Sequence, residues 1–105
     1  MDIQLKRGLL EVAVLAAIKN EPSYGYQIIK DLKPYVDISE STLYPILRRL
    51  ESSSCLTVES AAYNGRLRKY YHITPLGRQK IREFREEWGQ ILSIFDFIVK
   101  EDTRG

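Results

Sequence analysis

The chain has one cysteine, one histidine and one tryptophan among its 105 residues, and this scarcity excludes several kinds of chemistry. A single thiol, Cys55, can form neither an intrachain disulfide nor a site built from several thiols. We expect it to be a packing residue at a helix end, with a redox sensor as the alternative. His72 alone cannot hold a metal ion. The sequence also lacks an acid pair, a nucleophile–base arrangement and a glycine-rich phosphate loop, so we expect no enzyme and no cofactor.

Long hydrophobic runs are also missing. The first apolar run, residues 9–18, contains Glu11, which fits neither a signal peptide nor a membrane span. With 44% hydrophobic and 29% charged residues, the composition is that of a soluble globular protein. We therefore expect one cytoplasmic domain without a membrane partner.

Acidic residues are absent from one long stretch. The net charge is only +2, yet between Glu59 and Glu83 every charged residue is basic: Arg66, Arg68, Lys69, Arg78, Lys80 and Arg82. From Glu83 onward, acidic residues outnumber basic ones. A basic patch on a nearly neutral protein indicates a local site for a polyanion. A solvated hairpin and helix would carry the same charges, so charge alone does not decide the function.

Apolar spacing and turn residues predict four helices and one hairpin. The helices are expected at residues 4–19, 24–33, 39–53 and 75–100, and the strands at residues 56–63 and 66–73. In the first helix, one apolar face holds Leu9, Val12, Ala13 and Ala16, with Leu15 at its border. Ser23 is the expected N-cap of the second helix, where Gly25 would let another helix pack close. Asn64-Gly65 predicts a type I′ turn, and Thr74-Pro75 predicts a capped helix start.

The third helix has a polar outer face. Leu43, Ile46, Leu47 and Leu50 form its inner face. Ser41, Pro45, Arg48 and Ser52 lie opposite, flanked by Thr42, Tyr44 and Arg49. Hydroxyl groups, a tyrosine and arginines are side chains that reach base edges and phosphates. Pro45 lacks an amide donor, so the helix should begin within about one turn before it or bend there.

The hairpin that follows is basic on its second strand. Alternation predicts that Leu67, Tyr71 and Ile73 face the core and that Arg66, Arg68, Tyr70 and His72 face away, with Lys69 reaching out near the tip. A helix followed by a basic hairpin is the order of a winged helix-turn-helix, a mainly α (α+β) fold that binds double-stranded DNA. We assign residues 1–74 to this DNA-binding part.

The last helix is too long for so small a domain to bury. Its apolar residues alternate by three and four and predict a helix-on-helix seam: Ile81, Phe84, Trp88, Ile91, Phe95 and Ile98, widened by Leu92 and Val99. We expect residues 75–105 to build a homodimer, forming one compact unit with the rest. Packing on the chain's own first helix is the alternative. Trp88 is expected either to pack in the seam or to stack a flat ligand in a pocket with Phe84, Ile91 and Leu92.

These motifs resemble one family. The residues concerned are 23–26 (SYGY), 42–51 (TLYPILRRLE), 64–66 (NGR), 68–74 (RKYYHIT) and Gly77. In this order and spacing, the chain is similar over nearly its whole length to the PadR-like transcriptional regulators of bacteria, in the branch with one C-terminal helix. The resemblance implies a dimeric winged-helix repressor, in some members released from DNA by a small aromatic effector. It maps the DNA contacts onto Ser41, Thr42, Tyr44, Arg48, Arg49, Gly65, Arg66, Arg68 and Lys69.

Two positions depart from the family's pattern. Ser41 stands where the family commonly has glycine, and Ser54-Cys55 replaces a glycine-containing turn after the third helix. Without glycine, we expect that turn to use another conformation. Two other classes of winged helix also remain open, a protein-binding module and an RNA-binding module in which Tyr24 and Tyr70 stack bases.

Overall fold

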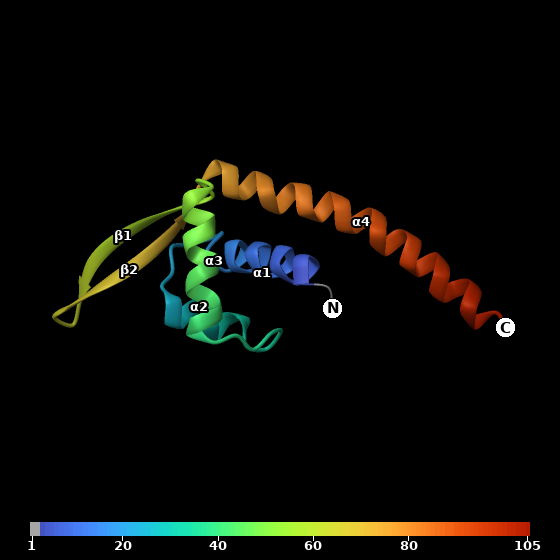
Figure 1. The fold of residues 1–105 in the computed structure, drawn as a ribbon, viewed down its shortest axis with the longest axis horizontal. Helices are drawn as coiled ribbons and strands as arrows, with labels where there is room; N and C mark the ends of the chain where they lie inside the picture. The colour runs from blue at the N-terminus through green and yellow to red at the C-terminus, as the bar shows by residue number, and fades with distance from the viewer. Residues whose placement is uncertain (1–2) are drawn as a thin grey trace.

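The computed structural model describes residues 3–105 and confirms a mainly α winged helix-turn-helix. Its elements are α1 (Ile3–Ala17), α2 (Gly25–Leu32), α3 (Glu40–Ser52), β1 (Leu56–Tyr63), β2 (Arg66–Ile73) and α4 (Pro75–Thr103). Figure 1 shows the hairpin projecting from one side of a helical body and α4 projecting from the other. The predicted elements are all present, although α1 ends two residues earlier and α4 three residues later than expected.

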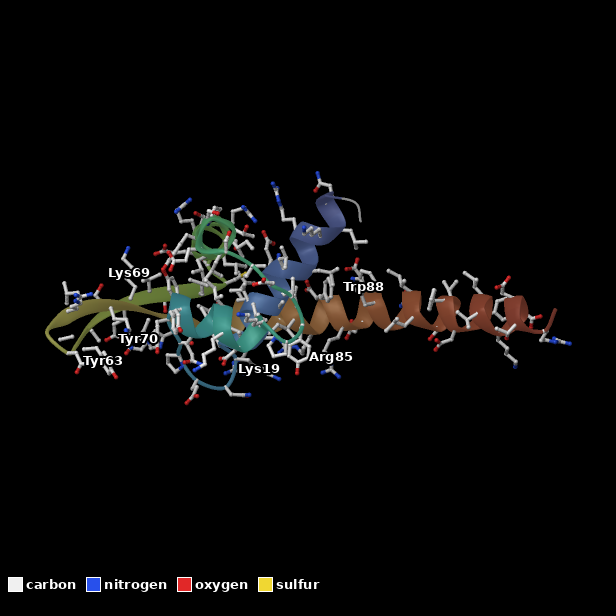
Figure 2. The ribbon with its side chains drawn as sticks, turned by 90° about the horizontal axis from the view of Figure 1, so that it is seen from below. Lys19, Tyr63, Lys69, Tyr70, Arg85 and Trp88 are labelled. Atoms are coloured by element: carbon white, nitrogen blue, oxygen red, sulfur yellow. The ribbon has the colours of Figure 1, made fainter. Side chains whose placement is uncertain are left out.

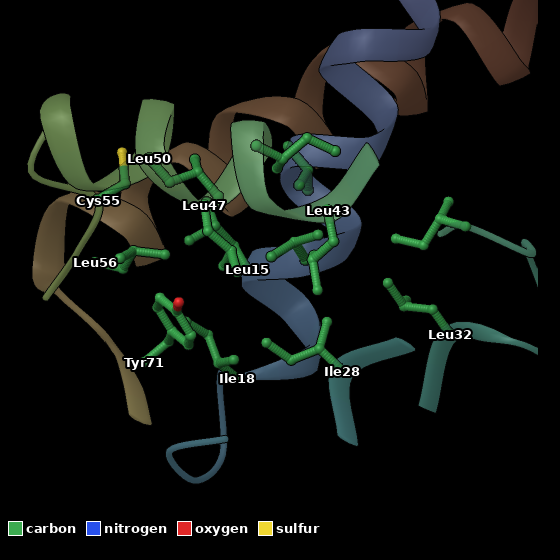
Figure 3. Close-up of a cluster of buried hydrophobic side chains, with 14 of the residues drawn as sticks. Leu15, Ile18, Ile28, Leu32, Leu43, Leu47, Leu50, Cys55, Leu56 and Tyr71 are labelled. Carbon is green, nitrogen blue, oxygen red and sulfur yellow. The ribbon is translucent and has the colours of Figure 1, made fainter. Parts of the chain in front are cut away.

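The core lies where α1, α2 and α3 meet the base of the hairpin. Figure 3 shows its largest side chains, which come from all three helices and both strands. The predicted inner face of α3 is buried throughout. For the first helix the prediction was partly wrong: Ala16 is exposed, while Val14 in α1 and Ile18 just after its end are buried. Three neighbouring elements surround α1, so its buried surface is broader than one stripe.

The two strands pair antiparallel from Leu56↔Ile73 to Tyr63↔Arg66. Asn64 and Gly65 both have positive φ, 49° and 76°, as the predicted type I′ turn requires. The expectation that Leu67 faces the core was wrong, because its side chain is 81% exposed. Only the base of the hairpin reaches the helices, so alternation buries Tyr71 but not a residue near the tip.

Ser23 is not the N-cap of α2. That position belongs to Tyr24, whose side chain makes no capping hydrogen bond. Ser23 is instead buried and pairs with β2: its amide donates to the Tyr71 carbonyl at 3.2 Å, and the Tyr71 amide donates to the Ser23 carbonyl at 2.7 Å. The segment before α2 therefore forms a bridge along the outer edge of the hairpin.

The turn after α3 adopts a glycine-like conformation without glycine. Ser54 has a φ of 63°, in the left-handed region. The Ser54 amide donates to the Glu51 carbonyl at 3.0 Å, and the Cys55 amide donates to the Leu50 carbonyl at 2.8 Å. These two bonds form a Schellman motif. The expectation of a different conformation was wrong, because the hydrogen bonds that close the helix require a left-handed residue here whatever its side chain.

Replacing Ser54 with glycine is expected to stabilise the protein. A left-handed conformation costs a residue with a Cβ roughly 1 kcal/mol, and glycine avoids that cost. Among the described residues, the hydrogen bond that joins Ser54 to the start of α4 is made by its carbonyl, which accepts from Thr74 Oγ1 at 2.6 Å, and glycine retains it. We expect the melting temperature of Ser54→Gly to rise by about 4–8 °C in a thermal melt followed by circular dichroism. Ser52→Gly, inside α3, should lower it; a fall for Ser54→Gly too would contradict this account.

The first part of α4 packs on α1, and the rest extends beyond it (Figure 1). Ile81 is buried and Phe84 is packed against the core, so the alternative of packing on the chain's own first helix holds for this part. Ile81, predicted to lie in a seam between subunits, is instead buried within its own chain. From residue 89 onward every side chain of α4 is exposed. Among the described residues, no helix is long and apolar enough to cross a membrane.

Candidate nucleic-acid interface

The first turn of α3 presents a cluster of hydroxyl groups. Ser39 caps the helix: the Thr42 amide donates to Ser39 Oγ at 3.3 Å, and the Ser39 hydroxyl lies 2.8 Å from Ser41 Oγ. Ser41 and Thr42, both predicted DNA contacts, are exposed. Pro45 lies just over one turn into the helix and has no N–H for the Ser41 carbonyl. This turn therefore offers polar groups to an incoming ligand.

Tyr44 lies at the junction of α3 and α2. A Cβ added to Gly25 would come 2.7 Å from Tyr44 Oη, so the predicted role of Gly25 in close helix packing is confirmed. The tyrosine remains 37% exposed. Its ring is thus held in place by α2 while part of it faces solvent. Behind it, burial raises the pKa of Tyr71; Tyr44 and Glu51 add to this shift, and Arg48 opposes it.

The two arginines of α3 have different surroundings. Arg49 Nε donates to Glu11 Oε1 at 3.0 Å, and Lys80 Nζ lies 3.5 Å from Glu11 Oε2. The Glu11 side chain is only 14% exposed, so it joins α1, α3 and α4 through a shielded ion pair. Arg48 is exposed and, among the described residues, forms no ion pair. Its guanidinium is therefore free to bind a ligand.

The hairpin forms a basic wing beside α3. Its exposed tip carries Gly65, Arg66 and Lys69, and Figure 2 shows Lys69 pointing to the side of the hairpin on which α3 stands. A groove of about 670 Å³ separates the wing from the helices, with α3 contributing Glu40 and Tyr44 to its lining. The groove thus lies between the start of α3 and the wing cations.

Arg68 is held differently from the other wing cations. Its Cζ lies 3.9 Å from the centroid of the Tyr24 ring and 4.0 Å from that of the Tyr63 ring. Tyr24 also meets Tyr70 edge-on, with centroids 5.7 Å apart. Both tyrosines proposed to stack RNA bases are therefore occupied in contacts within the protein.

Sequence reasoning gave no role in this site to Glu11 or Tyr63. Glu11 is 38 residues from Arg49, and Tyr63 ends a strand whose register had to be known before its neighbour Arg68 could be named. The sequence does show that Glu11 is a lone acid within the apolar first helix. Only the fold shows that it pairs with Arg49 and Lys80.

The predicted seam on α4 divides into two parts. Phe84 and Trp88 are half-buried and touch each other, with centroids 5.7 Å apart. Together with Leu5 and Gly8 of α1 and Ile91, they line an apolar groove of about 540 Å³, whose lining does not include Leu92. Farther along, the apolar side chains are exposed: Ile91, Leu92, Ile94, Phe95, Phe97, Ile98 and Val99. All of them except Phe97, which the helical repeat places on the opposite side of α4, lie along one broad stripe. Apolar surface of this kind marks interaction sites.

Comparison with known proteins identifies the fold and the family together. The family model described as the transcriptional regulator PadR-like family matches residues 14–83, from within α1 to within α4. The chain belongs to this PadR-like family. It is 31% identical to an uncharacterized protein from Lysinibacillus sphaericus over 90% of this chain and 91% of that protein.

Solved structures agree with this assignment. The smu.1704 protein of Streptococcus mutans UA159 superposes with a TM-score of 0.81 at 38% identity, over 90% of this chain and 89% of that one. A PadR family transcriptional regulator from Eggerthella lenta DSM 2243 gives 0.80 at 34% identity, over 92% of this chain and 87% of that one. PadR-like proteins are DNA-binding transcriptional regulators and are generally not enzymes. The winged helix of this chain is accordingly a DNA-binding fold.

Proposed function

We propose that this PadR-like chain is a cytoplasmic homodimeric repressor that binds a near-palindromic operator. The observation that carries the proposal is the groove between the start of α3 and the wing, with cations on its wing side. In this arrangement α3 enters a major groove, and the wing lies along adjacent phosphates. The proposed contacts are those predicted from the sequence: Ser41, Thr42, Tyr44, Arg48, Arg49, Gly65, Arg66, Arg68 and Lys69.

These contacts differ in their roles. Arg48, exposed and unpaired among the described residues, is the candidate for reading a base. Arg49 is fixed by Glu11 and is suited to a phosphate at the edge of the site. Arg66 and Lys69 on the exposed wing contact the backbone, where each neutralised phosphate makes binding more sensitive to salt.

The second half of α4 supports the dimer. Residues 1–74 form the DNA-binding part, and residues 75–105 form the dimerisation helix of one compact unit. The exposed apolar side chains of α4 other than Phe97, with Phe84 and Trp88 at their inner end, are the surface that a second copy covers. Two copies would then set their α3 helices roughly 34 Å apart, which accounts for a near-palindromic operator. The bound dimer blocks transcription by covering the promoter.

A small aromatic effector is proposed to bind at the apolar groove beside Trp88. A volume of about 540 Å³ suits a drug-sized molecule. Such a ligand would release DNA if it favours a different angle of α4 and so a different spacing of the α3 helices. Titration of tryptophan fluorescence with flat aromatic compounds tests this, and an unchanged signal across a diverse set would exclude the pocket.

Binding to DNA is tested by fluorescence anisotropy with the promoter upstream of the chain's own gene. We expect tight binding to this duplex, a steep dependence on salt and much weaker binding to a scrambled duplex. Arg48→Ala should weaken specific binding by roughly 1–3 kcal/mol while leaving scrambled DNA little changed. Arg85→Ala is the matched control, because Figure 2 shows Arg85 on the side of the molecule away from α3.

Other outcomes would redirect the assignment. Equal loss on both duplexes would make Arg48 a phosphate contact, and no loss on either would remove it from the interface. If the unchanged protein binds neither duplex at low salt, the repressor proposal fails at this promoter. Competition with duplex RNA separates an RNA-binding module from a DNA-binding one.

A further inference from the structure

The wing projects from the helical body and has few anchors toward its tip. At its base, Tyr71 is buried and forms two backbone hydrogen bonds with Ser23, of 3.2 and 2.7 Å. Beyond this bridge, the strands are exposed apart from the half-buried Val58, Arg68 and Tyr70. An isolated two-stranded hairpin is only marginally stable in water. A further contact is therefore needed to hold the tip at one angle to the body.

Arg68 supplies that contact. Its Cζ lies 3.9 Å from the centroid of the ring of Tyr24, which precedes α2, and 4.0 Å from the centroid of the ring of Tyr63 at the end of β1. Tyr70, on the same face of β2 as Arg68, meets Tyr24 edge-on. Figure 2 shows Tyr63 and Tyr70 on the side of the hairpin away from Lys69. A planar cation in contact with two aromatic rings thus joins the wing tip to the body.

The same geometry separates Arg68 from its neighbours. Arg66 and Lys69 are exposed, and among the described residues neither forms an ion pair or a cation–π contact. They remain free to bind phosphates. Arg68 is half-buried by the two rings and is already engaged without DNA. Arg68 therefore aids DNA binding by holding the wing in position in the free protein.

We propose that Arg68 is a positioning residue whose guanidinium, held by Tyr24 and Tyr63, fixes the angle of the wing relative to α2 and α3. This fixes where Arg66 and Lys69 lie relative to the start of α3, so the wing reaches DNA already ordered and loses less conformational freedom on binding. The inference rests on the proposed DNA-binding function, and it changes the role given to Arg68 from phosphate contact to clamp.

Hydrogen–deuterium exchange of the full chain tests the clamp without DNA. Arg68→Ala should speed the exchange of amides on the distal half of the wing, while the melting temperature of the core changes little. Arg68→Lys should also speed this exchange, though less than Arg68→Ala, because an ammonium group can keep a cation–π contact with one ring but cannot stack a flat group between two. Arg66→Ala is the matched control and should leave exchange unchanged. Unchanged exchange in Arg68→Ala would overturn the proposal.

The dependence of DNA affinity on salt tests whether Arg68 aids DNA binding without itself contacting a phosphate. Arg68→Ala should weaken promoter binding about tenfold without changing the slope of log affinity against log salt. Arg66→Ala should lower that slope by about 0.9, the value for one lost phosphate contact. Tyr63→Leu should weaken binding similarly, and combining it with Arg68→Ala should add little.

The opposite result would return Arg68 to the phosphate contacts. A slope lowered by about 0.9 in Arg68→Ala, together with normal binding by Arg68→Lys, would overturn the clamp. If the unchanged protein binds no duplex, the proposed function fails, but the exchange experiment still decides whether Arg68 holds the wing.

Discussion

Replacing Gly77 with alanine is expected to lower the free energy of unfolding by about 3 kcal/mol. A Cβ at Gly77 would overlap the backbone carbonyl oxygen of Cys55 and come 2.8 Å from Ile73 Cγ1. The carbonyl cannot move aside easily, because it accepts the Thr74 amide at 3.1 Å, and Thr74 Oγ1 donates to Ser54 at 2.6 Å. The methyl group would therefore separate the start of α4 from the end of α3.

Chemical denaturation followed by circular dichroism measures this loss in the free energy of unfolding. In a thermal melt the melting temperature should fall by roughly 12–24 °C. Gly89→Ala is the matched control in the same helix. A Cβ there would meet nothing within 4 Å, so the substitution should stabilise the helix by about 0.8 kcal/mol. Equal stability of the two variants would show that the junction at Cys55 is looser than its hydrogen bonds indicate.

Replacing Phe95 with aspartate is expected to convert the proposed dimer into a folded monomer and to weaken operator binding at least about 100-fold. Phe95 is 55% exposed in the single chain and lies among the apolar side chains of the projecting half of α4. A carboxylate buried there without a partner would be costly for the dimer. The same substitution should change the stability of the monomer little, because the side chain at position 95 is exposed to water there. A monomer holds one half-site at a time and loses the advantage of simultaneous binding.

Sedimentation velocity gives the mass, and anisotropy with full and half-site duplexes gives the affinities. Ser93→Asp adds the same charge two residues away, on the opposite side of α4, where the side chain is exposed. It should leave both the dimer and operator binding unchanged. A dimer that persists in Phe95→Asp would exclude this surface, and a monomer with full operator affinity would refute the need for two copies.

Local signals predicted the secondary structure well. Asn64-Gly65 tolerates positive φ, so the hairpin turn could be placed from two residues. Thr74 and Pro75 predicted the start of α4, where the Gly77 amide donates to Thr74 Oγ1 at 3.1 Å. Prediction was wrong where a residue's role depends on distant partners: Ser23 pairs with Tyr71 rather than capping α2.

The candidate site was predicted as a set of residue types, without their surroundings. Four arginines, Arg48, Arg49, Arg66 and Arg68, look equivalent in the sequence. In the fold, Arg49 is paired with Glu11 and Arg68 lies against two tyrosines, whereas Arg48 and Arg66 are exposed. The surroundings therefore divide the arginines into those already engaged within the chain and those free to bind.

The elements, the turn of the wing and the family motifs depend on neighbours a few residues apart, so they could be predicted from the sequence. Which charged and apolar side chains are free became clear only in the folded chain. An ion pair such as Arg49–Glu11 joins residues 38 positions apart, and the exposure of Leu67 depends on how far the hairpin extends past the helices. Whether a group is available depends on what surrounds it in space, and no pattern along the chain contains that information.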